Sequence, residues 1–164
     1  MYRTAYYLLF HLFFLTITIG CKSDRKQEKQ TIYLPENLEV IHQENSAKFD
    51  DNWYKNEFKV VVFVKNAGPY STLDLDWQSV MKEFPNIAFL FYVSEKDKPK
   101  LIDHLERVGF THPVIHDPEE AFRKSNLKER ELTFISFLVK NDKIVGMSNP
   151  SFPDFKVRLE ELSK

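Results

Sequence analysis

Two uninterrupted apolar runs constrain the fold of this 164-residue chain more than any other feature. The first lies in residues 59–64, where Lys59 precedes five apolar residues, and the second occupies residues 87–93; β-branched and aromatic residues dominate both. A continuous apolar run of this length is typical of a strand that is buried on both faces of a sheet. Strands of this kind alternate with helices in α/β proteins, so the sequence predicts a central sheet flanked by helices.

Helical patterns follow both runs. After the first run, five apolar residues fall on one stripe of a helix: Leu73, Trp77, Val80, Met81 and Phe84. Ser71 and Asp74 have the spacing of a capping box, so this helix is expected to begin at Ser71. After the second run, Asp97 is expected to cap a helix that Gly109 ends in the left-handed conformation.

The rest of the chain predicts one more strand-helix unit, a hairpin and a last helix. Three short strands are expected, at residues 113–115, 133–139 and 143–147. Asp117 has the context of a helix start, Asn141-Asp142 that of a tight turn, and Pro153 opens the last helix. The order is βαβαβα, then a β-hairpin, then α, which predicts a mixed sheet. Residues 31–56 carry only short apolar stretches, and their arrangement is not predicted.

This order of elements resembles the thioredoxin-like superfamily, which includes thioredoxins and peroxiredoxins. The similarity is greater to the thioredoxin-like lipoproteins and resident disulfide-handling proteins of Gram-negative cell envelopes. Those proteins carry an extra strand-helix unit before the C-terminal hairpin, which residues 113–126 would supply here. The resemblance covers residues 59–162 and implies a thioredoxin-like fold for a domain of residues 31–164.

The same resemblance locates a dithiol motif that this chain has lost. Active members place Cys-x-x-Cys, often Cys-Gly-Pro-Cys, after the first long strand. The matching positions here hold Ala67, Gly68, Pro69 and Tyr70. The Gly-Pro centre is kept and both sulfur positions are replaced, while Trp77 matches a common feature of the lipoprotein subgroup. Active members also place a cis-proline before the hairpin strand, and residues 132–137 contain no proline.

These replacements remove the chemistry of the motif. A thiolate at a helix N-terminus has a lowered pKa and attacks a disulfide, and the second thiol then resolves the mixed disulfide. Ala67 and Tyr70 supply neither group, and the one cysteine of the chain is Cys21. The resemblance therefore implies a domain without an intramolecular thiol–disulfide reaction. An ordinary strand-to-helix turn is the alternative interpretation of the tetrapeptide.

The N-terminal segment predicts export. Residues 1–20 carry one basic residue, Arg3, and an apolar run that ends at Gly20, as in a secretory signal peptide. The segment resembles a bacterial lipoprotein signal peptide, although Thr18 stands where that family usually has Leu. The resemblance implies that Cys21 becomes the mature N-terminus and carries fatty-acyl chains such as palmitate. An uncleaved membrane anchor is the alternative. A membrane span needs about 20 apolar residues, and the apolar run here is near the lower limit of that length.

The residues after Cys21 predict how the domain is attached. Residues 21–30 contain no apolar side chain beyond Cys21 itself, so they are expected to form a flexible tether. Because Lys22 rather than Asp follows the cysteine, the resemblance favours the outer membrane. It does not choose between the periplasmic and the outer face of that membrane.

Composition and spacing argue against several other functions. The formal net charge of −1 does not indicate the basic surface that binds nucleic acid. On one strand, His112 and His116 would lie about 13 Å apart, too far to share a metal ion. Asp74 and Asp76 lack the glycine and the closing Glu of a calcium loop. His104 is expected on an exposed helix face, and no cofactor is expected.

The predicted function is a membrane-anchored, redox-inactive lipoprotein that binds a protein partner of the cell envelope, as a binding or scaffold module. Superfamily members often bind extended polypeptide near the dithiol, so the expected contact surface comprises Tyr70, Trp77 and Phe134. The alternative is a thiol–disulfide or peroxide-handling oxidoreductase of the envelope, which would need a thiol other than Cys21. A non-redox enzyme has no supporting motif, and a fold alone cannot supply one.

Overall fold

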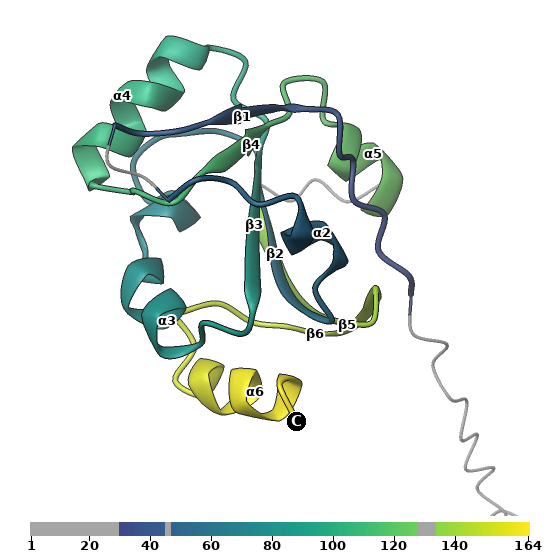
Figure 1. Ribbon diagram of the computed structural model, residues 1–164. Helices are drawn as coiled ribbons and strands as arrows, with labels where there is room; N and C mark the ends of the chain where they lie inside the picture. The colour runs from purple at the N-terminus through teal and green to yellow at the C-terminus, as the bar shows by residue number, and fades with distance from the viewer. Residues whose placement is uncertain (1–29, 45–46, 128–133) are drawn as a thin grey trace, which may run out of the picture.

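The computed structural model of the chain describes residues 30–44, 47–127 and 134–164 (Figure 1). The predicted signal peptide, Cys21 and all but the last residue of the predicted tether lie outside these residues. Within the described ranges, no helix is both long and apolar enough to cross a membrane.

A six-stranded mixed sheet forms the centre of the domain, with the strand order β1-β4-β3-β2-β5-β6 (Figure 1). The strands are β1 Glu39–Ile41, β2 Phe58–Val64, β3 Ala88–Val93, β4 Val114–His116, β5 Phe134–Lys140 and β6 Lys143–Met147. β2 pairs in parallel with β3, and β3 with β4, whereas β1·β4, β2·β5 and β5·β6 are antiparallel. The prediction of a mixed sheet is confirmed.

Helices cover both faces of this sheet. They are α2 Asn52–Lys55, the 3-10 helix η1 Thr72–Asp74, α3 Trp77–Glu83, α4 Lys98–Val108, α5 Ala121–Asn126 and α6 Phe155–Leu162. One hydrophobic core joins α3, α4 and α6 to the sheet, and a second core joins α2 and α5 to it. The predicted α/β architecture, a sheet flanked by helices, is therefore confirmed.

β2 supplies side chains to both cores, as its five consecutive apolar residues 60–64 predict. Val60 and Val62 belong to the core beneath α3, α4 and α6, whereas Val61 and Phe63 belong to the core beneath α2 and α5. Successive side chains of a strand point to opposite faces, so residues 60–64, which lie between two helical layers, are all apolar. All four of these side chains are fully buried.

The segment after β2 differs from the prediction of one helix beginning at Ser71. The Ser71 hydroxyl accepts a hydrogen bond from Leu73 N, but it caps only the short η1. α3 begins at Trp77, and Asp76 caps it by accepting from Ser79 N at 3.1 Å. The capping-box prediction is wrong because Asp76 provides a second cap, which starts the regular helix later.

α4 follows its predicted caps, whereas α5 begins at Ala121, later than predicted, with Glu120 as its N-cap residue. The Asp97 side chain accepts from Lys100 N at the start of α4, and Gly109 ends this helix with φ 64°. Before α5, the Asp117 carboxylate accepts from the backbone amides of Ala121 and Phe122 at 2.8 and 2.9 Å. β4 and α5 form the expected extra strand-helix unit before the hairpin.

The C-terminal hairpin and the last helix are also confirmed. Asn141 and Asp142 both adopt left-handed backbone conformations, with φ 49° and 58°, as a two-residue hairpin turn requires. α6 turns Phe155, Leu159 and Leu162 toward the core.

The N-terminal part of the domain forms a strap that the sequence did not predict. It begins beside β6, where Ile144 N donates to Gln30 O, and Ile32 N donates to Asp142 O. It then crosses to the opposite edge of the sheet, where β1 pairs with β4 (Figure 1). The Asn126 side chain holds it on the way by bonding to both the N–H and the carbonyl of Tyr33, each at 2.8 Å.

Candidate functional site

The loop of residues 67–70 follows the carboxyl end of β2, where the resemblance places the dithiol. It forms one wall of a pocket of about 370 Å³, and α4 forms the other. The lining residues are Ala67, Gly68, Pro69, Asp97, Pro99, Lys100, Asp103, His104 and Arg107. Those from α4 are spaced by three or four positions, so they lie along the single helix face that is turned to the loop.

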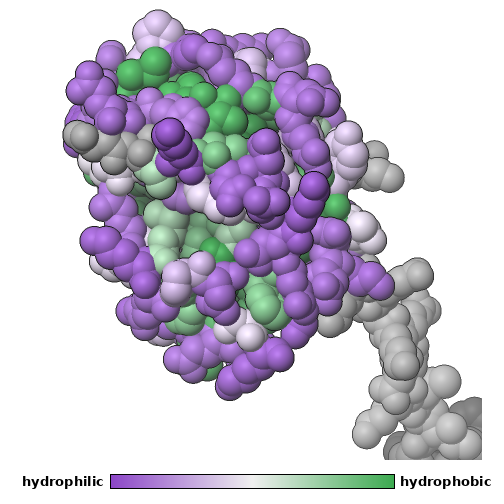
Figure 2. Space-filling model, viewed as in Figure 1, coloured by the Kyte–Doolittle hydropathy of each residue, from purple (hydrophilic) through white to green (hydrophobic). Residues whose placement is uncertain are grey.

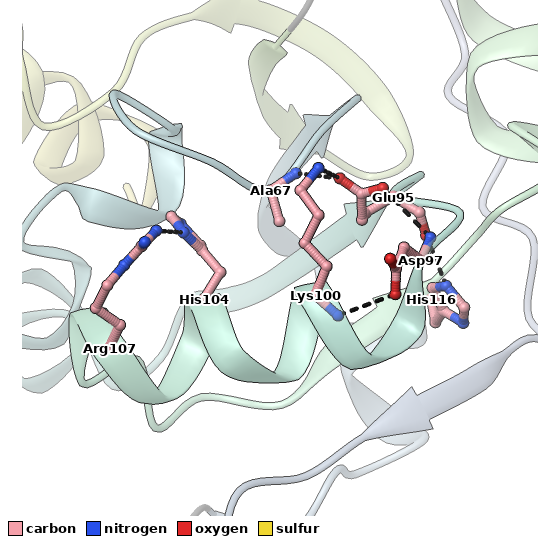
Figure 3. A network of polar contacts seen from close by, with 7 residues as sticks. All are labelled: Ala67, Glu95, Asp97, Lys100, His104, Arg107 and His116. Carbon is pink, nitrogen blue, oxygen red and sulfur yellow. Dashed lines mark hydrogen bonds and ion pairs between the residues drawn. The ribbon is translucent and has the colours of Figure 1, made fainter.

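Glu95 connects this loop to the start of α4 (Figure 3). Its carboxylate is 7% exposed and accepts hydrogen bonds from Ala67 N at 3.2 Å and from Asp97 N at 3.3 Å. It also forms an ion pair with Lys100, and its backbone carbonyl lies 2.8 Å from His116 Nε2. Burial raises the pKa of the Glu95 carboxyl, but the Lys100 ammonium and the backbone amides outweigh it, so the pKa lies below its usual value.

Tyr70 is the exposed tip of the loop. It is 96% exposed and has φ 65°, a left-handed conformation that a bulky residue rarely adopts. Ala67, at the other former sulfur position, is 1% exposed. The two positions therefore differ in environment, since one is buried against Glu95 and the other projects into solvent.

The local backbone is unsuited to activating a thiol. In an active site the nucleophilic sulfur gains from a helix N-terminus, but here only the short η1 follows the loop and α3 starts at Trp77. The Ala67 amide is already bonded to the negative carboxylate of Glu95. A nearby carboxylate opposes thiolate formation, so this environment would raise the pKa of a thiol placed at position 67.

The structure does not place Trp77 and Phe134 in an exposed contact surface with Tyr70. A surface role for Trp77 is wrong, because its side chain is fully buried and packs against Phe91 and Phe155. Phe134 opens β5, with its backbone paired opposite Val64, and its side chain lies outside the described part of the chain. Of the three predicted contact residues, Tyr70 alone is shown to be exposed.

His104 corrects another prediction, because it is 3% exposed rather than on an exposed helix face. Arg107 Nη2 lies 2.6 Å from His104 Nδ1, and a guanidinium can only donate, so Nδ1 accepts and Nε2 carries the proton. Nε2 lies 3.0 Å from Asp74 Oδ1, although poorly aligned for a hydrogen bond. The ring thus links α4 to η1, and these polar neighbours explain its burial.

His112 and His116 also have structural partners. His112 Nε2 lies 2.9 Å from the Phe89 carbonyl, and its ring stacks on Trp53 at 4.9 Å between centroids. His116 is buried and contacts the Glu95 carbonyl. No group of three potential metal ligands occurs within the described residues.

Glu95 is the site residue that sequence reasoning missed. A charged residue two positions after a wholly buried strand was the available signal, because such a residue sits where the carboxyl ends of parallel strands meet. Its partners are Ala67, Asp97 and Lys100, and the pairing of a backbone amide with a distant carboxylate leaves no pattern in the sequence.

Replacing Glu95 with alanine is expected to lower the free energy of unfolding by about 1–3 kcal/mol, because the buried Ala67 amide loses its acceptor. Urea-induced unfolding monitored by circular dichroism would measure the loss. Lys100→Ala is the matched control: its ammonium is half exposed, so a change below about 1 kcal/mol is expected. Equal effects of the two substitutions would contradict a structural role for the amide contact.

No protein-family model matches the chain, and no curated protein matches its sequence. Two solved structures resemble the domain. A thiol-disulfide oxidoreductase from Bacteroides fragilis NCTC 9343 aligns with a TM-score of 0.54 and 14% identity, covering 65% of this chain and 82% of that one. A chain named as a thiol:disulfide interchange protein, DsbE, from Chlorobium tepidum gives 0.52 and 15%, covering 66% and 78%.

Similarity at this level of identity shows the fold alone. The predicted thioredoxin-like fold is therefore confirmed: both structures share the arrangement of a mixed sheet flanked by helices with this domain.

Proposed function

We propose that this chain is a lipid-anchored, thioredoxin-like protein of the Gram-negative cell envelope whose domain binds a protein partner without thiol–disulfide exchange of its own. One observation carries the proposal: Ala67 and Tyr70 occupy both sulfur positions of the loop, and residues 22–164 contain no cysteine. Exchange requires a thiolate to attack and a leaving thiolate to depart, so a domain without sulfur at this loop has no group for either step.

The binding surface in this proposal is the 67–70 loop with its pocket against α4. Tyr70 supports this, because a large aromatic side chain held in solvent matches the anchors that dominate binding at protein interfaces. Its left-handed backbone is an unfavourable conformation for tyrosine, and such conformations concentrate at functional sites. The loop is also fixed in place, because Glu95 joins Ala67 to the start of α4.

The lipid anchor in this proposal is Cys21. Its position directly after the apolar N-terminal run supports acylation, and two or more acyl chains would hold the protein firmly at a membrane. The residue after Cys21 is Lys22 rather than Asp, which supports attachment to the outer membrane.

The second candidate is an envelope oxidoreductase for thiol–disulfide or peroxide chemistry. The two structural neighbours are named as thiol–disulfide proteins, and those names favour this candidate over a redox-silent scaffold. No comparison supports the scaffold role itself. An oxidoreductase would have to use Cys21 or a thiol from another molecule, because the domain supplies none.

Disulfide reduction separates the two candidates. The mature chain, incubated with insulin and dithiothreitol, is expected to reduce insulin no faster than dithiothreitol alone, and Cys21→Ser is expected to behave identically. Turnover by the mature chain that Cys21→Ser abolishes would establish the oxidoreductase instead. Ala67→Cys/Tyr70→Cys restores both sulfurs and is the positive control for thiol titration, with weak activity expected because Glu95 disfavours the thiolate.

Partner binding is tested by cross-linking in intact membranes. Tyr70→Ala is expected to weaken capture of the principal cross-linked protein about tenfold or more, because interface aromatics often contribute over 2 kcal/mol. His42→Ala, an exposed residue directly after β1, is the matched control and is expected to leave capture unchanged. If Tyr70→Ala captures the partner as well as the parent does, the loop is not part of the binding surface.

A further inference from the structure

The strap ends in a short strand at one edge of the sheet. β1 is three residues long and lies beside β4, so few backbone hydrogen bonds hold it. Short edge elements of this kind open locally at a low cost in free energy, and one side-chain contact can shift that equilibrium. In the view of Figure 2 the surface of the domain is mostly hydrophilic, with smaller hydrophobic areas between the polar side chains. Polar side chains are therefore plentiful around the short elements of this surface.

His116 joins β1 to the candidate loop. It lies on β4 opposite Glu39 of β1, and it is buried. Its Nε2 is 2.8 Å from the Glu95 carbonyl, whereas its Nδ1 is 3.6 Å from Glu39 Oε2 (Figure 3). Glu95 in turn accepts from the Ala67 amide. One imidazole ring therefore stands between the strap and the residue that holds the 67–70 loop.

Both ring nitrogens of His116 face acceptors. A backbone carbonyl can only accept, so Nε2 carries a proton. An ionised carboxylate can also only accept, and Glu39 stays ionised. The hydrogen bond from Lys98 lowers the pKa of the Glu39 carboxyl most, burial opposes it, and the Lys98 charge and His116 lower it further. A neutral ring has one N–H and can donate to one of the two acceptors, whereas the charged ring can donate to both.

The charged groups around the ring come from β1, α4 and the segment between β3 and α4. Glu39 favours the charged ring, and Lys98 of α4, which is bonded to the same carboxylate, opposes it. The Glu95 carboxylate is paired with an ammonium group of α4. Asp117 follows the histidine, but its carboxylate accepts from the first two amides of α5. The neighbour of His116 on β3 is a valine. Glu39 is therefore the group that can reward a second proton on the ring.

We infer that His116 is a proton-dependent clasp between the strap and the 67–70 loop. As the pH falls, the ring gains a proton at Nδ1, and the new donor to Glu39 fixes β1 against β4. The positive charge also strengthens the bond from Nε2 to the Glu95 carbonyl, and Glu95 holds the loop. As the pH rises, the lone pair of Nδ1 faces the carboxylate and the clasp opens. The consequence that partner binding is stronger at low pH rests on the function proposed above.

Hydrogen exchange of the full chain in detergent micelles tests the clasp without a partner. Protection of the β1 amides and of the Ala67 amide, corrected for the intrinsic effect of pH, is compared at about pH 8 and about pH 5.5, which bracket the ordinary titration of histidine. Both are expected to be about two- to fivefold higher at the lower pH, as one partly exposed ion pair provides. Amides in the centre of β2 report global unfolding instead.

Three variants separate the clasp from other effects of pH. Glu39→Gln removes the carboxylate charge and is expected to abolish the pH difference in β1 and at Ala67. His116→Gln keeps an N–H donor for the Glu95 carbonyl but cannot titrate, so the same loss is expected. Glu36→Gln, at an exposed position elsewhere on the strap, is the control and is expected to behave as the parent does. A pH difference that survives in Glu39→Gln, or that only follows the β2 amides, would overturn the inference.

Partner capture tests the consequence for binding. With a photoactivated cross-linker, whose reaction does not depend on amine protonation, the parent is expected to capture about two- to fivefold more partner at the lower pH. Glu39→Gln is expected to capture equally at both. Capture by the parent that does not change with pH would overturn the regulation of binding. Undiminished capture by Tyr70→Ala would instead contradict the proposed binding surface, and the exchange experiment gives its result in either case.

Discussion

Replacing Trp77 with alanine is expected to lower the free energy of unfolding by about 3–5 kcal/mol. Trp77 is fully buried, and its ring packs edge-on against Phe91 and Phe155 with centroids 5.2 and 5.8 Å away. Its Nε1 also donates to the Thr72 carbonyl at 2.7 Å. Alanine would leave a cavity between β3 and α6 and a buried carbonyl without its donor, and both effects destabilise the domain.

Urea-induced unfolding followed by circular dichroism would measure this loss, with two variants as references. Trp77→Phe retains most of the apolar volume and loses the hydrogen bond, so an intermediate loss is expected. Trp53→Ala removes a partly exposed tryptophan of the second core and is expected to cost less than Trp77→Ala. A Trp77→Ala loss below about 1 kcal/mol, within the range of ordinary substitutions, would show that the core tolerates this cavity.

The position of Trp77 also changes its relation to the candidate site. The sequence places it in a binding surface by resemblance, whereas the structure places it beneath the loop. Its hydrogen bond to Thr72 holds η1, which begins two residues after Tyr70. Trp77 is thus a positioning residue for the loop. Its burial agrees with the general pattern, because an aromatic residue on the apolar stripe of a helix is usually part of the core.

The elements that could be predicted from the sequence are those encoded locally. β3 is apolar at every position, and β2 at every position except Lys59, because each lies between two helical layers. Asp97 and Gly109 bound α4 through contacts within a few residues, and the Asn141-Asp142 turn depends on its own backbone. Such signals remain in the sequence whatever the rest of the chain does.

The elements that could not be predicted depend on partners far along the chain. The strap is held by β6 and by Asn126, more than 90 residues away from it, and its own sequence shows no period. Glu95 gains its role from the Ala67 amide, and His104 is buried because Arg107 and Asp74 surround its ring nitrogens. A polar side chain is ordinarily assigned to the surface, and only the folded chain supplies the partners that permit its burial.

Acidification is expected to destabilise the domain through His112 by about 3 kcal/mol in total. Burial lowers the pKa of His112 to about 4, although the hydrogen bond to the Phe89 carbonyl favours the charged form. The ring lies among Trp53, Phe91 and Phe110, so a proton on it would place a charge among aromatic side chains.

The sign follows from comparing the folded and unfolded chains. An unfolded histidine takes up its proton near pH 6.5, whereas His112 in the folded chain does so only near pH 4. Between these values the unfolded state binds more protons, so stability rises with pH. The stability that the neutral His112 ring contributes is therefore fully present above about pH 6.5. It declines by up to about 1.4 kcal/mol per pH unit below that value and is lost below about pH 4.

His112→Phe isolates this contribution from the carboxyl groups that titrate over the same range. Phenylalanine keeps the ring stacked on Trp53 but cannot take up a proton, so its stability is expected to change less than that of the parent between pH 7 and pH 4. Urea unfolding at half-unit steps of pH would measure the difference, and His42→Phe, at an exposed position, should follow the parent. Parallel stability curves for His112→Phe and the parent would mean that the folded domain accommodates the charged ring. In that case the stacked Trp53 face would have to stabilise the imidazolium as a cation–π partner.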